Sequence, residues 1–62
     1  METKLLLTVN EAAEALGLSR AKLYQILNRG EILSVRIGGS RRIPVSTLRE
    51  YVASLESEAA NA

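Results

Sequence analysis

Two short stretches of the sequence carry the side chains best suited to binding another molecule. Residues 19–28 bring arginine, lysine, tyrosine, glutamine and asparagine together within one segment. Residues 35–44, VRIGGSRRIP, place Arg36, Arg41 and Arg42 around a Gly-Gly pair. Such side chains form hydrogen bonds and charge-assisted contacts with phosphates and base edges. A simple turn needs the glycines but not the arginines, so both stretches are candidates for binding a polyanion.

Side chains suited to catalysis and metal binding are scarce. The chain has no histidine and no cysteine, and all seven of its acidic residues are glutamates. This composition excludes His-based triads, cysteine nucleophiles, disulfides and zinc fingers with the usual ligands. Thr8 and Ser19 have the positions of helix caps rather than of nucleophiles. We therefore expect no enzyme activity, no catalytic residue, no metal site and no cofactor.

The charges are unevenly distributed along the chain. Residues 19–49 contain seven of the eight Lys and Arg residues and, in Glu31, a single acidic residue. The segments before and after them are acidic, although the net charge of the whole chain is only +1. This asymmetry indicates a polyanion as partner. A solvated basic face without a partner is the alternative, and charge alone does not separate the two.

Length and hydropathy predict a single small domain. The chain has 62 residues, 47% hydrophobic and 24% charged, as in soluble globular proteins. No apolar run approaches the roughly 20 residues of a membrane span, and residues 5–7 are too few for the apolar part of a signal peptide. We expect one domain over residues 1–62, with a core over about 5–56, a flexible tail at 57–62 and a cytoplasmic location.

Local signals predict two helices joined by a tight turn. Thr8 and Glu11 form a capping box, with Leu7 and Ala12 at the positions of a hydrophobic staple. Gly17 ends this helix. Its apolar face consists of Val9, Ala12, Ala13 and Leu16.

The second helix begins at the Ser19 cap and ends before Gly30. Its inner face consists of Leu23, Ile26 and Leu27. Two short helices with this connection outline a helix-turn-helix.

After Gly30 the hydrophobic period changes from that of a helix to that of a strand. The alternation of Leu33, Val35 and Ile37 with polar residues predicts a half-buried strand. The sequence GGS then forms a turn, and the return strand is limited by Pro44. A last helix capped by Ser46 follows. Its inner positions are Leu48, Tyr51, Val52 and Leu55, and the hydroxyl of Tyr51 is expected to reach solvent.

The outward face of the second helix is a candidate for the major groove of DNA. Ala21 suits a close approach or a thymine methyl group, and Gln25 and Asn28 have the amide geometry that pairs with adenine. The backbone N–H groups near Ser19 attract a phosphate. The other candidates for phosphates or bases are Arg20, Lys22 and Tyr24, the last predicted to face outward. An ordinary amphipathic helix with a polar outer face is the alternative.

The hairpin is the second candidate surface. Gly38 and Gly39 allow a close approach of the backbone, and arginines suit phosphates and narrow minor grooves. Arg36 adds a phosphate contact or, alternatively, forms a cross-strand pair with Glu31 or stays solvated. For Arg49 an ion pair with a nearby glutamate is favoured. The proposed hairpin contacts are Arg36, Gly39, Ser40, Arg41 and Arg42.

Residues 5–52 resemble the excisionase-type, MerR-like winged helix-turn-helix family. The resemblance rests on LTVNEAAEALGLS, on LYQILNRGEI and on VRIGGSRRIPVSTLREYV, in this order and spacing. It implies a mostly α fold with a small β-hairpin, in which the second helix enters the major groove and the hairpin, or wing, reaches the minor groove or backbone. The contacts carried over are Ser19, Arg20, Lys22, Tyr24, Gln25, Asn28, Gly39, Ser40, Arg41 and Arg42.

The resemblance also implies partners and a role. Double-stranded DNA is the main partner, with further copies of the chain in head-to-tail order and an integrase as additional ones. The implied role is an excisionase that binds repeated sites cooperatively, bends DNA and directs an integrase toward excision. Full MerR regulators add a dimerising helix and an effector domain, for which this sequence leaves no room, so no small-molecule effector is expected. A small transcriptional regulator is the alternative, and a protein-interaction adaptor is a third hypothesis.

Overall fold

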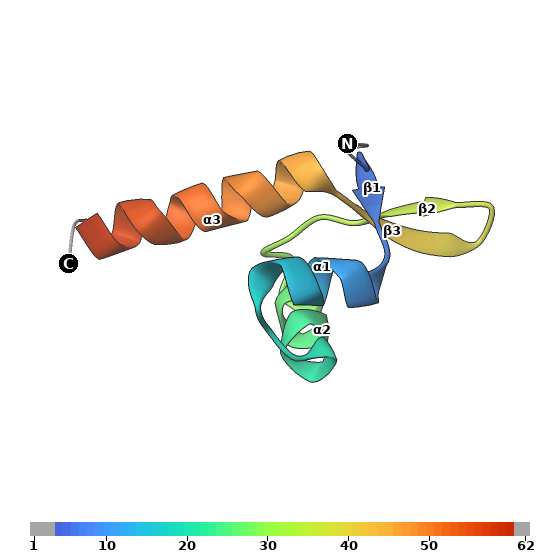
Figure 1. Cartoon of the computed structure of the whole chain (residues 1–62), viewed down its shortest axis with the longest axis horizontal. Helices are drawn as coiled ribbons and strands as arrows, with labels where there is room; N and C mark the ends of the chain where they lie inside the picture. Colours follow the sequence, from blue (N-terminus) through green and yellow to red (C-terminus); the bar gives the residue numbers. More distant parts are fainter. Residues whose placement is uncertain (1–3, 61–62) are drawn as a thin grey trace.

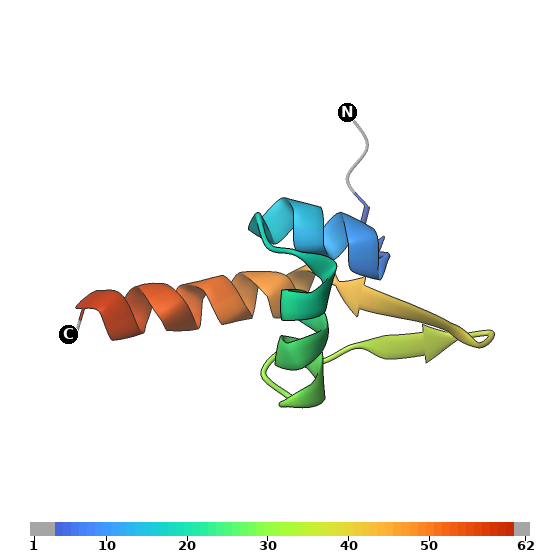
Figure 2. The ribbon, with the colours of Figure 1, turned by 90° about the horizontal axis from the view of Figure 1, so that it is seen from below.

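The computed structural model describes residues 4–60, which form three helices and three short strands (Figure 1). The helix α2 projects from the middle of the molecule, between the hairpin β2–β3 on one side and the long helix α3 on the other (Figures 1 and 2). In chain order the elements are β1 (Leu6–Leu7), α1 (Val9–Leu16), α2 (Arg20–Asn28), β2 (Val35–Ile37), β3 (Ser40–Pro44) and α3 (Val45–Ala60).

The strand β3 is the centre of a three-stranded antiparallel sheet with the order β1-β3-β2. On one side Leu7 lies opposite Ile43, and on the other Arg36 lies opposite Arg41. The sequence predicts the hairpin but not the third strand. The segment before the first helix adds this strand to the inner end of β3, and the N–H of Val45 donates to the carbonyl of Leu5 at 2.9 Å.

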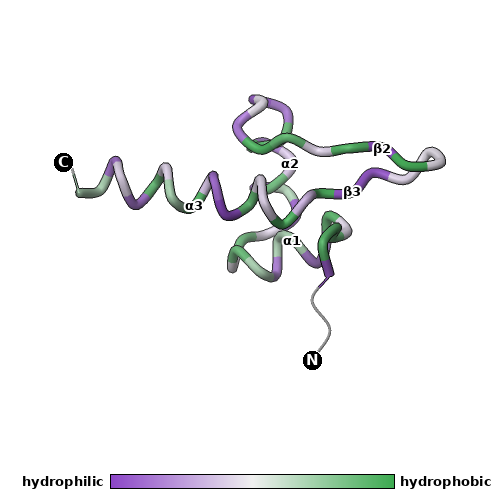
Figure 3. The backbone as a smooth tube through the Cα atoms, turned by 90° about the horizontal axis from the view of Figure 1, so that it is seen from above, coloured by the Kyte–Doolittle hydropathy of each residue, from purple (hydrophilic) through white to green (hydrophobic). Residues whose placement is uncertain are grey.

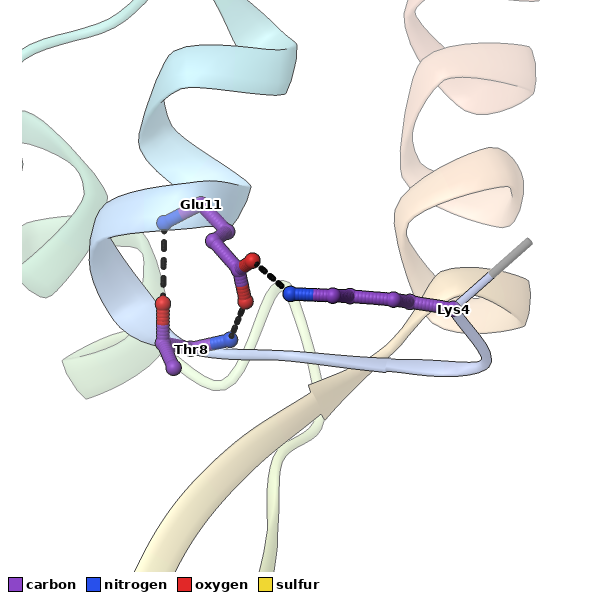
Figure 4. A network of polar contacts seen from close by, with 3 residues as sticks. All are labelled: Lys4, Thr8 and Glu11. Atoms are coloured by element: carbon purple, nitrogen blue, oxygen red, sulfur yellow. Dashed lines mark hydrogen bonds and ion pairs between the residues drawn. The ribbon is translucent and has the colours of Figure 1, made fainter. Parts of the chain in front are cut away.

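The start of α1 is fixed by a network of polar contacts (Figure 4). The N–H of Glu11 donates to Thr8 Oγ1 at 3.1 Å, and the N–H of Thr8 donates to Glu11 Oε1 at 2.9 Å. Lys4 Nζ donates to the other carboxylate oxygen of Glu11. The hydrogen bond from Lys4, together with that from the Thr8 backbone, lowers the pKa of Glu11 from 4.5 to about 2. The predicted capping box is confirmed.

The turn between α1 and α2 also follows the prediction. Gly17 has φ +73°, a left-handed conformation that glycine adopts without strain. Its N–H and that of Leu18 donate to carbonyls of the last turn of α1, at 3.1 and 2.9 Å. Ser19 then caps α2, since its Oγ accepts from the N–H of Lys22 at 3.1 Å. These contacts fix the orientation of α2 relative to α1 in the helix-turn-helix.

The core is small and consists entirely of apolar residues. Ala12 and Ala13 of α1 pack with the inner face of α2 and with one residue each from the loop, β3 and α3. The two alanines let the helices approach closely. Ile32 in the loop after α2 is part of the core although no sequence pattern predicted it. The buried residues are Ala12, Ala13, Leu23, Ile26, Leu27, Ile32, Ile43 and Leu48.

The last helix differs from the prediction at both ends. α3 begins at Val45, directly after β3, so Ser46 lies in its first turn and is not the cap. At the other end the helix continues to Ala60, so residues 57–60 are helical where a tail was expected; Asn61 and Ala62 lie outside the described residues. Within residues 4–60, no helix has the length and apolar character to cross a membrane.

The predicted inner face of α3 is only partly covered. Leu48 is buried and Tyr51 is half-buried against the core, as expected. Val52 and Leu55, one turn further on, are 39% and 45% exposed. The reason is that α3 extends beyond the rest of the molecule (Figures 1 and 2), so its outer turns have no layer to pack against.

The prediction of a half-buried strand at β2 is wrong. All three residues of β2 are exposed, and Leu33 just before it is 68% exposed. The tip of the hairpin extends away from the helices, and the hydropathic colouring shows apolar positions along β2 (Figure 3). Val35 and Ile37 of this strand are 40% and 56% exposed. The alternation of apolar residues predicted the strand correctly. Burial of its apolar side chains, however, needs a second layer of structure over β2, and residues 4–60 do not provide one.

Candidate nucleic-acid interface

The outward face of α2 presents the predicted polar residues to solvent. The buried stripe of Leu23, Ile26 and Leu27 fixes the rotation of the helix. On the other side the exposed residues are Arg20, Ala21, Lys22, Gln25 and Asn28. An exposed face with short, amide and basic side chains has the width and chemistry to enter a major groove. Ser19 is also exposed at the helix start, although its hydroxyl caps the helix.

Tyr24 lies differently from the prediction. Its ring is half-buried and packs against the core, because the residue follows Leu23 and flanks the buried stripe of α2. The Cζ atom of Arg20 lies over this ring, 5.7 Å from its centroid. The distance is that of a cation–π contact. The structure thus brings Arg20 and Tyr24 together, a pair that the four-residue spacing could have indicated.

The hairpin turn requires both of its glycines. Gly38 and Gly39 have φ values of +58° and +83°. Positive φ at both central residues is the requirement of the type I′ turn, which matches the twist of a two-stranded hairpin. A Cβ atom at either position would meet nothing within 4 Å, so the reason for glycine is conformational. The predicted tip is confirmed, and its backbone is open to close approach.

The predicted hairpin contacts divide between two faces. Residues directly opposite each other in an antiparallel pair point to the same side. Arg36 lies opposite Arg41 and shares one face with it, whereas Arg42 lies opposite Val35 and Ser40 opposite Ile37 on the other face. One face is therefore doubly cationic, and the other combines a single arginine with two exposed apolar side chains.

Side-chain hydrogen bonds position both arginines of β3. Arg41 Nε donates to Ser34 Oγ at 2.9 Å, and Arg42 Nη1 donates to the carbonyl of Arg41, also at 2.9 Å. Both arginines are half-buried, while Arg36 is exposed. Sequence reasoning missed the contribution of Ser34. The register set by the Gly-Gly turn puts Arg36 opposite Arg41, and Ser34, two residues before Arg36, lies diagonally from Arg41 on the same face, so the signal was present.

The cations of this surface lack anionic partners within the described chain. Among residues 4–60 the ion pair joins Lys4 to Glu11, and both of these lie outside the basic segment 19–49. The alternatives that paired Arg36 with Glu31, or Arg49 with a glutamate, are wrong for these residues. Arg36 instead faces Arg41, and like charges directly opposite each other destabilise a hairpin. An anion bound between them would remove this repulsion.

Comparison with known proteins places the chain in a family. A helix-turn-helix domain family matches residues 6–56. An "Excisionase" of Streptomyces ambofaciens is 33% identical over 54 residues, which cover 87% of each chain. The chain belongs to the excisionase-type helix-turn-helix family. A "Probable excisionase" of Saccharopolyspora erythraea is 51% identical over 55 residues, which cover 89% of this chain and 56% of that protein.

The excisionase-type match covers all the elements that form the candidate interface, from β1 to most of α3. The chain spans 56% of the length of the Saccharopolyspora relative and 87% of that of the Streptomyces one. No solved structure matches the chain at a significant level. The winged helix-turn-helix fold agrees with the family, while the MerR-like part of the resemblance stays a prediction.

Proposed function

We propose that the chain is a sequence-specific DNA-binding protein of the excisionase kind. In this proposal the exposed face of α2 enters the major groove, and the hairpin lies along the adjacent minor groove or backbone. The observation that carries it is the pair Arg36 and Arg41, two cations held opposite each other at a cost to the hairpin. A phosphate backbone supplies the missing anion, and the exposed backbone of Gly38 and Gly39 allows close approach.

A gel-shift titration at two salt concentrations tests the proposal. Each lysine or arginine that neutralises a phosphate adds about 0.9 to the slope of log affinity against log salt. We expect Arg41→Ala to lower the slope by about this amount and to weaken binding on every sequence. The matched control is Arg49→Ala, which removes an arginine from α3, outside the interface, and should leave both quantities nearly unchanged. Absence of any shift at low salt would reject DNA binding.

The excisionase role rests on the names of the two relatives. For this chain it means binding repeated sites cooperatively, bending the DNA and directing an integrase toward excision, with no catalytic step of its own. A DNA fragment with the native repeats should give a ladder of complexes and altered mobility that depends on the position of the bend. A single discrete complex at a promoter would support the alternative, a small transcriptional regulator.

Association of copies in head-to-tail order follows from the charge of the two ends. The hairpin with its arginines and the outer part of α3 lie at opposite ends of the longest axis, which measures 41 Å (Figure 1). α3 carries Glu50, Glu56 and Glu58, and Glu50 and Glu58 line a groove together with Leu33 and Leu55. This groove is complementary to the hairpin face that bears Val35, Ile37 and Arg42.

The length of the molecule suits such an arrangement. Its longest dimension of 41 Å exceeds one turn of DNA, about 34–36 Å, so copies in the same orientation on sites one turn apart can contact each other. Affinity for two sites spaced by one turn should then exceed that for sites spaced by one and a half turns. The double variant Glu50→Gln/Glu58→Gln should remove this difference while leaving binding to a single site nearly intact. Equal affinity for both spacings would contradict the head-to-tail proposal.

A further inference from the structure

The contact between Arg20 and Tyr24 has a geometry that suits base recognition. Arg20 is the first residue of α2, and Tyr24 lies one turn later on the same side. The Tyr24 ring is half-buried against the core, so it is a fixed surface. The guanidinium carbon of Arg20 lies over this ring at 5.7 Å. Contact with an immobile ring restricts a side chain that is otherwise long and free.

The stacked guanidinium keeps its hydrogen-bonding capacity. A cation–π contact uses the face of the group, whereas its N–H donors lie in the plane and point outward. Within the described part of the chain, no carboxylate forms an ion pair with Arg20 and no side-chain hydrogen bond uses its donors. Arg20 is exposed at the position from which recognition helices contact base edges.

We propose that Arg20 reads a guanine in the major groove and that Tyr24 is the residue that positions it. The inference rests on the proposed DNA binding and adds the base and the mechanism of its selection. Guanine offers N7 and O6 side by side, and a planar guanidinium matches both at once. Lys22, the other exposed cation of the first turn, carries a compact ammonium on a flexible stem and lacks the planar fork that fixes the direction of this contact.

Two other roles make different predictions. If Arg20 contacts a phosphate, its loss weakens binding equally on all sequences. If Tyr24 serves only the core, its replacement changes folding stability but leaves base preference untouched. Preference for one base at one position therefore separates the proposal from both, because neither a lost phosphate contact nor a looser core selects a single base pair.

The experiment measures base preference with a panel of DNA sites. A preferred site is first selected from random duplexes with the wild-type protein, and each position is then replaced in turn. For wild type we expect a guanine whose replacement costs about 5- to 150-fold in affinity. Arg20→Lys should reduce the preference at that position alone while keeping the positive charge, so the salt dependence stays nearly constant.

Two variants of Tyr24 test its positioning role. Tyr24→Phe keeps the ring and removes the hydroxyl, so the guanine preference should persist. Tyr24→Leu keeps an apolar side chain on the core but removes the ring, and the preference should fall by about 2- to 30-fold, the range of a cation–π contact. Circular dichroism and thermal melting confirm that each variant is folded before its binding is measured.

The outcomes are distinct. Uniform weakening by Arg20→Lys on all sites, or no preferred guanine at the position it affects, overturns the assignment of Arg20. An unchanged guanine preference in folded Tyr24→Leu, or its loss in Tyr24→Phe, overturns the role of the Tyr24 ring. If Tyr24→Leu does not fold, Tyr24→Met, which also keeps an apolar side chain and removes the ring, takes its place. Failure of the wild-type protein to bind any duplex rejects the proposed function itself. This outcome is seen with the wild-type protein alone, so it is distinct from the outcomes for the variants.

Discussion

The helix-turn-helix and the hairpin use their polar residues in opposite ways. In α1 and α2 the capping groups of Thr8, Glu11 and Ser19 are paired within the chain, and each helix buries one apolar stripe. In the hairpin Arg36 faces Arg41, and Ile37 is 56% exposed. The caps and buried stripes of the first region stabilise the fold, and only the outward face of α2 remains for other contacts. The like charges and exposed apolar residues of the hairpin do not stabilise the isolated chain, and they suit contact with another molecule.

The largest expected effect that tests this contrast is on folding. Leu23→Ala in α2 should cost about 2–5 kcal/mol, because the side chain is fully buried. At about 0.05–0.15 kcal/mol per residue, a chain of this length has only about 3–9 kcal/mol of stability, so the variant should lose a large share of it. Leu33→Ala is the matched control beside the hairpin and should change stability by less than about 0.5 kcal/mol. Urea titration followed by circular dichroism measures both.

A smaller effect is expected at the hairpin turn. Gly38→Ala should cost about 1–2 kcal/mol, since alanine disfavours the positive φ found there. Gly38→Asn is the control, because asparagine accepts the type I′ turn, and it should be close to neutral. Thermal unfolding gives the stability, and a gel shift gives the DNA affinity. Equal losses in the two variants would mean that the side chain, and not the backbone conformation, matters at this position.

Arg36→Thr should raise the folding stability, whereas Leu23→Ala and Gly38→Ala lower it. Removing one of two like charges that face each other, in favour of a residue that suits strands, should stabilise the hairpin by about 0.2–1 kcal/mol. The gain should shrink at high salt because screening already weakens the repulsion. DNA affinity should fall at the same time. A loss of stability at low salt would show that Arg36 supports the fold, and the contrast between the two regions would fail.

The smallest expected effect concerns the pH dependence of the α1 cap. The pKa of Glu11 is lowered to about 2, below the value of 4.5 for an unperturbed glutamate. The carboxylate therefore stabilises the folded chain at and above about pH 5, and this contribution is lost as pH falls from about 4.5 to about 2. The melting temperature of wild type should exceed that of Glu11→Gln at pH 6, and the difference should vanish near pH 2. A difference in melting temperature that does not change with pH would show that Glu11 acts through packing and not through its charge.

The sequence predicted those parts of the structure that depend on neighbouring residues. Thr8 with Glu11, Gly17 and Ser19 are signals within one helical turn, and all were confirmed. The Gly-Gly turn predicted the hairpin for the same reason. Residues 57–60 carried a local signal that was overlooked, since Glu and Ala favour helices.

Burial was harder to predict because it depends on distant parts of the chain. Ile32 is buried and Val35 exposed, although both are branched apolar residues of the same segment. The difference lies in whether another element covers them. The arrangement of the candidate interface also depends on distant parts of the chain. Its residues could be identified from type and spacing, but the stacking of Arg20 on Tyr24, and the division of the hairpin arginines between two faces, required the packed structure.

The outer half of α3 has a consequence for the motions of the chain. Isolated helices shorter than about 12–15 residues are marginal in water, and residues 52–60 are all exposed. Their amide hydrogens should exchange with solvent through local fraying, at rates close to those of a free peptide. The amides of Leu23 and Ile26, in contrast, should exchange only when the whole domain unfolds. A protein or DNA molecule that binds the end of α3 would slow amide exchange there first. Deuterium uptake along this helix therefore reports directly on whether α3 is bound.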